Sequence, residues 1–318
     1  MQPTAAINDF VIKFANVNGT GSASANGMFA KAIFRMGIPV SPRNIFPSNI
    51  QGLPTWYEVR ISQDGYLGRR GGIDMMVSVN PQSFAKDVGE VDPGGYMLYD
   101  STKPLDLRHV RRDIHYLGIP LTEMCLREYT DSRQRQLFKN VIYVGALSAL
   151  LNIDFAILKD LVSEQFKGKE KLITPNIHAL EMGHQYASTH FECPLGIQLK
   201  AGEKTPKHIQ ECDQILMDGN TATALGAVYA GATVAAWYPI TPSTSVVDAF
   251  EKYCRRLRID PGTGKRNHAI VQAEDELSAM GMVIGANWNG ARAFTATSGP
   301  GVSLMSEFLG LAYFAEVP

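Results

Sequence analysis

The chain lacks several patterns that would identify a protein at once. Its 318 residues contain four cysteines, Cys125, Cys193, Cys212 and Cys254, and no two of them form a C-x-x-C pair. Such wide spacing is typical of reduced thiols and argues against a disulfide framework or an iron–sulfur site. No apolar run reaches the roughly 18 residues of a membrane span, and the first residues lack the basic and apolar regions of a signal peptide. We therefore expect a cytoplasmic protein with no membrane partner.

The chain also lacks an excess of charge of either sign. Its formal net charge is -1, and 45% of its residues are hydrophobic and 19% charged, as in an ordinary globular protein. This balance gives no reason to expect nucleic acid as a partner. The length predicts about two domains.

What the sequence does contain is an alternation of strand-like and helix-like segments, with glycines where the apolar runs end. Strands are expected in FVIKFANV, TWYEVRIS, GIDMMVSVN and PGGYMLYDS, and a helix from about Gly27 to Met36. A long helical pattern, NVIYVGALSALLNIDFAILKDLVSEQF, contains a break near Asn152-Ile153-Asp154. This rhythm predicts an α/β fold with open, parallel sheets covered on both faces.

The same rhythm predicts two α/β domains. Residues 1–165 form the first, and residues 166–210, with KGKEK and two prolines, are expected to be a linker and tail with few core contacts. Residues 211–318 start the second domain, in which QILMDGN is expected as a strand and turn. The sequence stops after the helical pattern of LAYFAEVP, so we expect this domain to be incomplete and the chain to be the N-terminal part of a subunit roughly twice as long.

The segment NGTGSASANG, Asn18–Gly27, lies between a predicted strand and a predicted helix, where glycines can hold a phosphate on backbone N–H groups. Gly19 and Gly21 match the start of a dinucleotide fingerprint, but the third glycine position holds Ser24. No acidic residue follows the next strand; Arg43 stands there and suits a phosphate better. A tight turn without a ligand explains the pattern equally well.

A metal site is not expected in this chain. His184, His190 and Cys193 in HQYASTHFEC match no established zinc spacing, and the segment has no second pair of ligands.

Two motifs of the second domain follow predicted strands. YPITPST, Tyr238–Thr244, is stiffened by Pro239 and Pro242 and lies at the carboxyl end of a strand, where open α/β sheets bind ligands. The turn TSGPG, Thr297–Gly301, follows another strand, and alone it would be read as a short connection.

Three consecutive carboxylates, Glu274, Asp275 and Glu276, begin a predicted helix. Acidic residues favour the first helical turn, so helix capping explains any one of them. Helical phase separates them, because Glu276 borders an apolar stripe whereas Asp275 is better placed as a cap. A carboxyl beside apolar surface can exchange protons near neutral pH. The stripe consists of Leu277, Met280, Ile284 and Trp288.

The motifs YPITPSTS and VQAEDELSAMGMVIGANWNGARAFTATSGPG resemble the α subunit of the 2-oxoacid:ferredoxin oxidoreductases, which are thiamine-diphosphate enzymes, and most closely its 2-oxoglutarate branch. The first 165 or so residues resemble the Rossmann-like γ subunit of that family, with NGTGSASANG in place of its glycine-rich loop and YEVRIS as its middle strand. A γ domain fused before an α domain is a known arrangement. Where many γ chains carry an Arg-Gly pair, this sequence has Gln51-Gly52.

The resemblance implies a pyrimidine-binding domain in this chain, with the diphosphate, its Mg²⁺ and an iron–sulfur cluster held by a separate β subunit. The implied reaction is oxidative decarboxylation of a 2-oxoacid, with electrons passed to ferredoxin and the acyl group to coenzyme A. The implied partners are the β subunit, ferredoxin and a second α–β pair in a heterotetramer.

By position in the family motif, Glu276 is the glutamate on the pyrimidine N1′. The residues expected at the thiamine or the 2-oxoacid are Tyr238, Pro239, Thr241, Ser298 and Gly299. Candidate contacts to coenzyme A in the γ-like domain are Gly19, Gly21 and Arg43. An arginine for the substrate carboxylate is expected beyond the end of this sequence.

Two other readings stay open. The chain could be a non-catalytic assembly subunit or a nucleotide-binding module with the same fold, or part of another thiamine enzyme, such as a transketolase-like one.

Overall fold

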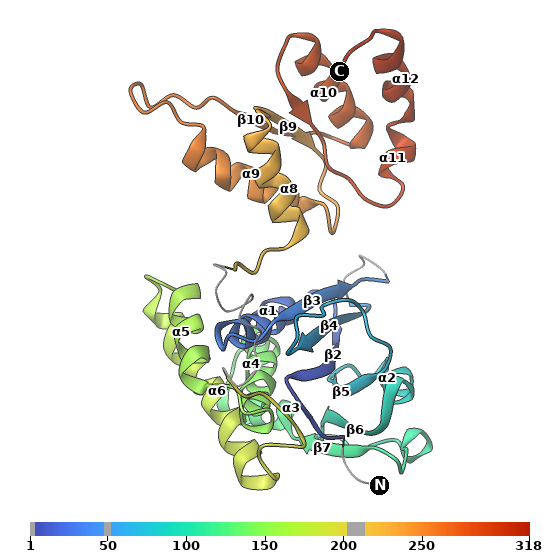
Figure 1. The fold of residues 1–318 in the computed structure, drawn as a ribbon, viewed down its shortest axis with the longest axis vertical. Helices are drawn as coiled ribbons and strands as arrows, with labels where there is room; N and C mark the ends of the chain where they lie inside the picture. Colours follow the sequence, from blue (N-terminus) through green and yellow to red (C-terminus); the bar gives the residue numbers. More distant parts are fainter. Residues whose placement is uncertain (1–3, 48–51, 202–213) are drawn as a thin grey trace. The chain divides into compact units, whose positions relative to one another are not determined.

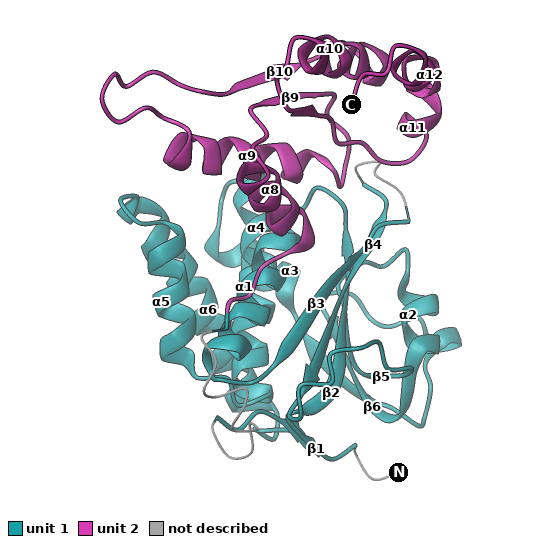
Figure 2. Cartoon of the chain, turned by 45° about the horizontal axis from the view of Figure 1, so that its top comes forward, with its two compact units in different colours: residues 1–214 teal, residues 215–318 magenta. Residues whose placement is uncertain are grey.

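The structure is a computed structural model that describes residues 4–47, 52–201 and 214–318. The chain divides into unit 1, residues 1–214, and unit 2, residues 215–318 (Figure 1; Figure 2). Each unit contains an open β-sheet with helices packed against it, so the predicted α/β fold class is confirmed. No helix of the described residues is long and apolar enough to cross a membrane.

Unit 1 is built on a six-stranded sheet in the order β3-β4-β2-β5-β6-β7. The last four strands run parallel, but β4 is antiparallel to both β3 and β2. The prediction of a fully parallel sheet is therefore wrong on this side. Only residues 46–53 connect β3 to β4, and an antiparallel pair can be joined by so few residues whereas a parallel pair needs a crossover of a dozen or more. The strands are β2 Asp9–Val17, β3 Val40–Ile45, β4 Pro54–Ser62, β5 Ile73–Ser78, β6 Val91–Asp100 and β7 His115–Ile119.

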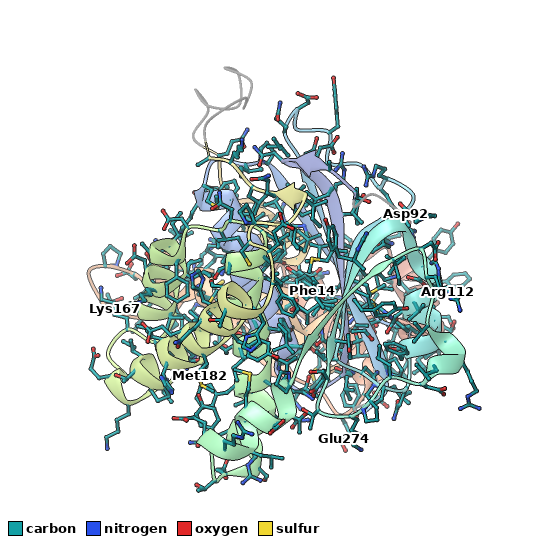
Figure 3. The ribbon with its side chains drawn as sticks, turned by 90° about the horizontal axis from the view of Figure 1, so that it is seen from below. Phe14, Asp92, Arg112, Lys167, Met182 and Glu274 are labelled. Atoms are coloured by element: carbon teal, nitrogen blue, oxygen red, sulfur yellow. The ribbon has the colours of Figure 1, made fainter. Side chains whose placement is uncertain are left out.

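Alternate residues of β2 face two different cores. Phe10, Ile12 and Phe14 face the larger core, which is covered by α1 (Ser22–Arg35) and α4 (Ser132–Leu150). Phe14 lies between the strands and these helices (Figure 3), 5.2 Å from the ring of Phe29 and 5.8 Å from that of Tyr143. The other face, with Val11 and Ala15, forms a smaller core with Val88 of α2 (Phe84–Glu90). This alternation is the pattern of a strand buried on both faces.

The predicted break in the long helical pattern is confirmed. Helix α4 ends at Leu150, Asn152 takes a left-handed conformation (φ 60°), and Asp154 caps α5 (Phe155–Gln165) by accepting a hydrogen bond from Ala156 N. Helix α3 (Leu121–Glu128) precedes α4.

The prediction that residues 166–210 make few core contacts is wrong for the helix α6, Glu170–His190. Its face of small residues, Ala179, Gly183 and Ala187, is buried, and the helix packs along α4 within unit 1. A face of small side chains carries a weak hydrophobic signal although it packs closely. Beyond it, β8 (Ile197–Gln198) pairs with β1 (Ala6–Ile7), and η1 (Leu107–His109) lies between β6 and β7. The expected start of the second domain at residue 211 lies outside the described residues.

Unit 2 contains a three-stranded parallel sheet in the order β10-β9-β11. Helices α8 and α9 cover one face, with Val228, Phe250 and Cys254 in their core, and α10 packs on the other face (Figure 1; Figure 2). The prediction of a strand in QILMDGN is wrong. Residues 214–218 form no strand, and Asp218 caps α8 by accepting a hydrogen bond from Thr221 N. The elements are α8 Gly219–Tyr229, β9 Val234–Trp237, α9 Thr244–Leu257, β10 Ala269–Gln272, α10 Glu276–Trp288, β11 Ala293–Phe294, α11 Gly301–Leu304 and α12 Ser306–Phe314.

Candidate active site

Three loops meet at one edge of the sheet of unit 2. Because β9, β10 and β11 are parallel, the residues that follow them lie at the same carboxyl edge. The loop Tyr238–Ser243 follows β9, residues 273–275 follow β10, and the segment Thr295–Pro300 follows β11. The fold therefore brings the two sequence motifs and the acidic cluster to one edge.

The loop after β9 is held by hydrogen bonds as well as by its prolines. The carbonyl oxygen of Ile240 accepts from Thr244 N at 3.1 Å and from Ser243 Oγ at 2.9 Å, and Asn220 Nδ2 donates to the carbonyl oxygen of Pro242 at 2.9 Å. Among the described residues the hydroxyl of the exposed Thr241 has no hydrogen-bond partner. The hydroxyl is therefore available to a ligand.

The two motifs are joined directly. Ser298 Oγ donates a hydrogen bond to the carbonyl oxygen of Thr241 at 3.0 Å. Gly299 has a φ of 60°, in the left-handed region that favours glycine, so the turn after Ser298 can reverse tightly. Tyr238 and Pro239 are exposed at the beginning of the other loop. The turn TSGPG is thus more than a connection, because it fixes the backbone beside Thr241.

The three residues of the acidic cluster, Glu274, Asp275 and Glu276, have different surroundings. Asp275 is the N-cap of α10, as predicted, and its Oδ1 accepts a hydrogen bond from Ser278 N at 2.6 Å. Hydrogen bonds from Ser278 lower the pKa of Asp275 below its ordinary value. Glu274 is exposed. Neither residue offers a carboxyl held in apolar surroundings.

Glu276, the first residue of α10, is only 8% exposed. It shares the buried face of the helix with Ala279, Val283 and Ile284, whereas Trp288 of the predicted stripe is 64% exposed. The prediction of a stripe ending at Trp288 is therefore wrong, and Glu276 lies on the buried face itself instead of at its border. Among the described residues its carboxyl group has no hydrogen-bond or ion-pair partner. Its oxygens are not among the buried side-chain atoms without a partner, so the carboxyl group of this largely buried side chain is accessible to a ligand.

Gly301 lies against the side chains of Thr297 and Glu276. A Cβ at this position would overlap Thr297 Oγ1 and would lie 3.1 Å from Glu276 Cγ. The hydroxyls of Thr295 and Thr297 are both buried and have no partner among the described residues. Glycine is required at 301 because the side chains of Thr297 and Glu276 converge there.

Two family models match the chain. The model described as pyruvate ferredoxin/flavodoxin oxidoreductase matches residues 11–186, which is more than half of the sequence. The model described as the thiamine-diphosphate-binding part of pyruvate flavodoxin/ferredoxin oxidoreductase matches residues 225–318. The chain belongs to the pyruvate ferredoxin/flavodoxin oxidoreductase family.

Curated members of the family are similar over nearly the whole chain. The α subunit of 2-oxoacid:ferredoxin oxidoreductase 2 from Aeropyrum pernix is 29% identical, over 98% of this chain and 54% of its own length. The 2-oxoglutarate oxidoreductase subunit KorA of Mycobacterium tuberculosis is 25% identical, over 98% and 50%. The chain spans about half the length of these relatives.

A solved structure supports the same resemblance. The 2-oxoglutarate:ferredoxin oxidoreductase from Magnetococcus marinus, with 2-oxoglutarate, coenzyme A and succinyl-CoA bound, matches with a TM-score of 0.76 and 28% identity, over 98% of this chain and 51% of its own. The predicted resemblance to this family is confirmed.

In unit 1 the glycine loop joins β2 to α1 at the carboxyl end of β2. Gly19 and Gly21 have φ values of 86° and 77°, as the tight turn requires. Helix α4 covers one side of this loop, since a Cβ at Gly21 would overlap Leu137 and Asn140 Nδ2 donates to the carbonyl oxygen of Thr20 at 2.9 Å.

The structure does not bring Arg43 to that loop. In the register of the sheet, Arg43 on β3 lies opposite Glu58 on β4. Glu58 in turn lies opposite Lys13 in the middle of β2. These cross-strand partners share the face of Val11 and Ala15, whereas α1 lies on the opposite face. The expected difference at Gln51 lies outside the described residues.

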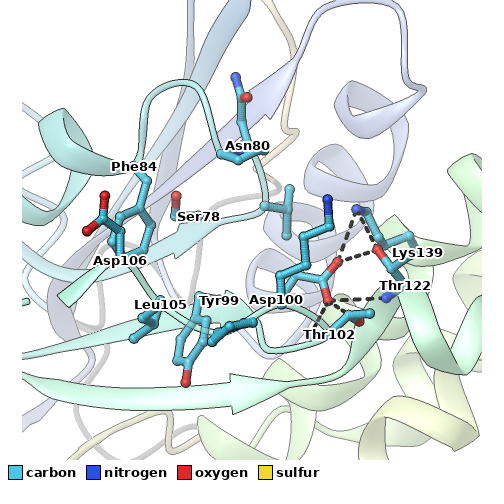
Figure 4. Close-up of a pocket in the computed structure, with 14 residues that line it drawn as sticks. Ser78, Asn80, Phe84, Tyr99, Asp100, Thr102, Leu105, Asp106, Thr122 and Lys139 are labelled. Carbon is cyan, nitrogen blue, oxygen red and sulfur yellow. Dashed lines mark hydrogen bonds and ion pairs between the residues drawn. The ribbon is translucent and has the colours of Figure 1, made fainter. Parts of the chain in front are cut away.

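A cavity that the sequence reasoning missed lies at the same edge of the sheet of unit 1, beyond the carboxyl ends of β5 and β6 (Figure 4). Its volume is about 430 Å³, and Asn80, Phe84, Tyr99 and Lys103 are among its lining residues. No motif marks it, because its walls come from segments as far apart as Ser78 and Lys139.

Asp100 organises the polar end of this cavity. It accepts hydrogen bonds from the hydroxyl groups of Thr102 and Thr122, and Lys139 Nζ lies 3.3 Å from its Oδ2. Burial alone would raise the pKa of Asp100, but these hydrogen bonds and the ammonium group of Lys139 outweigh it and lower the pKa. The ammonium group of Lys139 is therefore occupied by its ion pair with Asp100, whereas Lys103 is exposed at the rim of the cavity.

The three residues considered for a metal site each have a partner of their own. His184 Nδ1 lies 2.8 Å from Ser148 Oγ, the His190 ring stacks on Tyr186 at 4.0 Å, and Cys193 Sγ contacts the carbonyl oxygen of Ala187. Within residues 4–47, 52–201 and 214–318, no group of three or more histidine, cysteine or acidic side chains is placed to hold a metal ion.

Proposed function

We propose that this chain contributes the pyrimidine-binding part of a thiamine-diphosphate-dependent 2-oxoacid:ferredoxin oxidoreductase. The observation that carries the proposal is Glu276, a largely buried side chain whose carboxyl has no partner among the described residues, at the carboxyl edge of the sheet that the thiamine-binding family model covers. The hydroxyl of Thr241 at the same edge, which also has no partner within the described part of the chain, supports it. These groups fit the polar edge of an aminopyrimidine, which needs hydrogen-bonding partners in an otherwise apolar pocket.

In this proposal thiamine diphosphate supplies the carbanion chemistry that cleaves a 2-oxoacid, and the chain supplies position and protons. Glu276 holds a proton or a strong hydrogen bond at the pyrimidine N1′. The hydroxyl of Thr241, on a loop fixed by two prolines and by Ser298, orients the cofactor or the 2-oxoacid. Tyr238, Pro239 and Gly299 shape the entrance around them.

The finer parts of the proposal rest on the relatives. The names of several relatives and the bound ligands of the Magnetococcus marinus enzyme favour 2-oxoglutarate as the 2-oxoacid, coenzyme A as the acyl acceptor and ferredoxin as the electron acceptor. We further propose a β subunit that holds the diphosphate, Mg²⁺ and an iron–sulfur cluster, and a heterotetramer of two α–β pairs.

For unit 1 we propose a contact with coenzyme A at the carboxyl edge of its sheet. Gly19 and Gly21 follow β2 there, and the 430 Å³ cavity beyond β5 and β6 offers aromatic walls for a planar ring. Lys103 at its rim is a better candidate for a phosphate contact than Arg43, which lies on the α2 face of the sheet in mid-strand.

The substitution Glu276→Gln tests the proposed function. We expect turnover with a 2-oxoacid and deuterium exchange at the thiamine C2 to fall about 10²- to 10⁴-fold, while folding stays intact. Glu274→Gln and Asp275→Asn are matched controls, and they should affect the stability of the start of α10 and little else. Wild-type exchange in Glu276→Gln would show that the acidic cluster is only a helix start.

Cofactor titration separates this function from an assembly role. Thiamine diphosphate should raise the melting temperature of the complex that contains this chain, because it binds the folded state only. A non-catalytic subunit would show no such shift, and another type of thiamine enzyme would show the shift without reducing ferredoxin.

A further inference from the structure

Thr297 presents a second unexplained polar group beside Glu276. Its Oγ1 is buried and has no partner among the described residues, whereas the next residue, Ser298, donates to the carbonyl oxygen of Thr241. A buried hydroxyl without a hydrogen bond is destabilising, so its presence calls for a partner that binds there or moves there.

The geometry places this hydroxyl near the side chain of Glu276. Phe294 and Ala296 pack into the core formed by α8 and α9, so the alternate residues Thr295 and Thr297 face the other side of the sheet, where α10 lies. At Gly301 a Cβ would meet both Thr297 Oγ1 and Glu276 Cγ. Because residue 301 has no Cβ, both side chains can approach its Cα closely.

We propose that Thr297 is a positioning residue for Glu276, and this proposal rests on the function proposed above. A carboxyl that gives a proton or hydrogen bond to a ring nitrogen uses one oxygen, and its second oxygen then needs a donor. The Thr297 hydroxyl is the donor placed to supply it. It holds the carboxyl plane so that the first oxygen points toward the aminopyrimidine.

Thr295 provides a matched control. It is the same residue type, its Oγ1 is also buried without a partner among the described residues, and like Thr297 it alternates with Phe294 and Ala296, which pack into the core. It follows β11 directly, two residues before Thr297, and so lies farther from the turn that meets Glu276.

The test is the affinity for thiamine diphosphate, measured by calorimetry on the complete complex after removal of the cofactor. We expect Thr297→Val to raise the dissociation constant about tenfold, as for a lost hydrogen bond to a carboxyl group. Thr297→Ser should stay within about twofold of the wild type, and so should Thr295→Val. If the valine variant does not fold, the contrast between Thr297→Ala and Thr297→Ser gives the same answer.

A double-mutant cycle distinguishes positioning from a purely structural role. In a Glu276→Ala background the substitution Thr297→Val should cause no further loss of affinity. Unchanged affinity in Thr297→Val, or an equal loss in both backgrounds, would overturn the proposal. A wild-type complex that does not bind thiamine diphosphate would instead refute the proposed function itself.

Discussion

Thr241 combines an exposed hydroxyl with a backbone that cannot adjust easily. Its loop is fixed by Pro239 and Pro242, and the hydroxyl of Ser298 donates a hydrogen bond to the carbonyl oxygen of Thr241. Removing the hydroxyl in Thr241→Ala should lower kcat/KM severalfold or more without a change in melting temperature, since no protein contact of the hydroxyl is lost among the described residues. Thr244→Ala is a useful comparison, because the Thr244 hydroxyl donates within the loop at 3.2 Å and its loss should affect stability. Equal kinetics in Thr241→Ala and the wild type would exclude Thr241 from the site.

Asp87 is a fully buried carboxylate that three side chains hold in place. It accepts from Trp56 Nε1 at 2.8 Å, from Ser78 Oγ at 2.9 Å and from Ser83 Oγ at 2.8 Å. Asp87→Ala would leave these donors unpaired, and we expect unit 1 to lose about 3 kcal/mol of unfolding free energy. Denaturant titration measures this loss, and a change below about 0.5 kcal/mol would contradict it.

The pH dependence of stability follows from the same residue. Burial raises the pKa of Asp87 above its ordinary 3.8, although the three hydrogen bonds oppose the shift. The contribution of this group to stability is thus present below pH 3.8 and is lost as the pH rises through the folded-state pKa. Asp87→Asn removes this titration, so its stability relative to the wild type should improve as the pH rises from about 3 to 6. A difference that stays flat with pH would show that Asp87 has the same pKa folded and unfolded.

Single residues also show how far the sequence could lead. The cap at Asp275 was predictable, and helical phase indicated that Glu276 lies close to the buried face, because it relates neighbours along one element. The face on which Arg43 lies was not predictable, because it is set by the register of β3 on β4 and of β4 on β2, and a shift of one residue would turn the side chain to the other face.

Helices α4 and α6 pack unusually closely, and glycine makes this possible. A Cβ at Gly183 would overlap the backbone of Ile142, and one at Gly145 would overlap the backbone of Leu180. Gly183→Ala should therefore separate the helices and destabilise unit 1 by about 1–3 kcal/mol. Gly27 in α1 is the matched control, since a Cβ there meets nothing within 4 Å, and Gly27→Ala should stabilise by about 0.5–1 kcal/mol. Thermal unfolding of both variants tests the contrast, which fails if the two changes have the same sign.

This packing also explains why α6 was missed as part of the core. KGKEK overlaps the start of the helix, and Pro175 lies inside the helix; both features usually favour a loop. Apart from Leu180, the buried residues of α6 are alanine and glycine, so its hydrophobic periodicity is weak. Close approach to α4 stabilises the helix, and tertiary contact of this kind is not visible in a local pattern.

Each compact unit of the chain contains a candidate site among its described residues. Unit 2 carries the proposed thiamine contacts at Glu276 and Thr241, and unit 1 carries the cavity beyond β5 and β6. Fold class and the unit 2 motifs were predictable, because α/β alternation and strand-end motifs are local. The cavity was not, because Ser78, Asp100 and Lys139 meet only through the order of the strands and the packing of α4.

If each unit binds its own ligand, substitutions in the two units should affect different constants. Lys103→Ala should raise the KM for coenzyme A about tenfold and leave the dissociation constant of thiamine diphosphate unchanged, since Lys103 lines only the cavity of unit 1. The effect should shrink at high salt, because the lysine is exposed and its charge is screened. Arg43→Ala is the decisive control, because Arg43 is also an exposed cation of unit 1 but lies in mid-strand on the α2 face of the sheet. If Arg43→Ala changed the KM for coenzyme A and Lys103→Ala did not, the phosphate contact would lie on that face, and the cavity would have to serve another purpose.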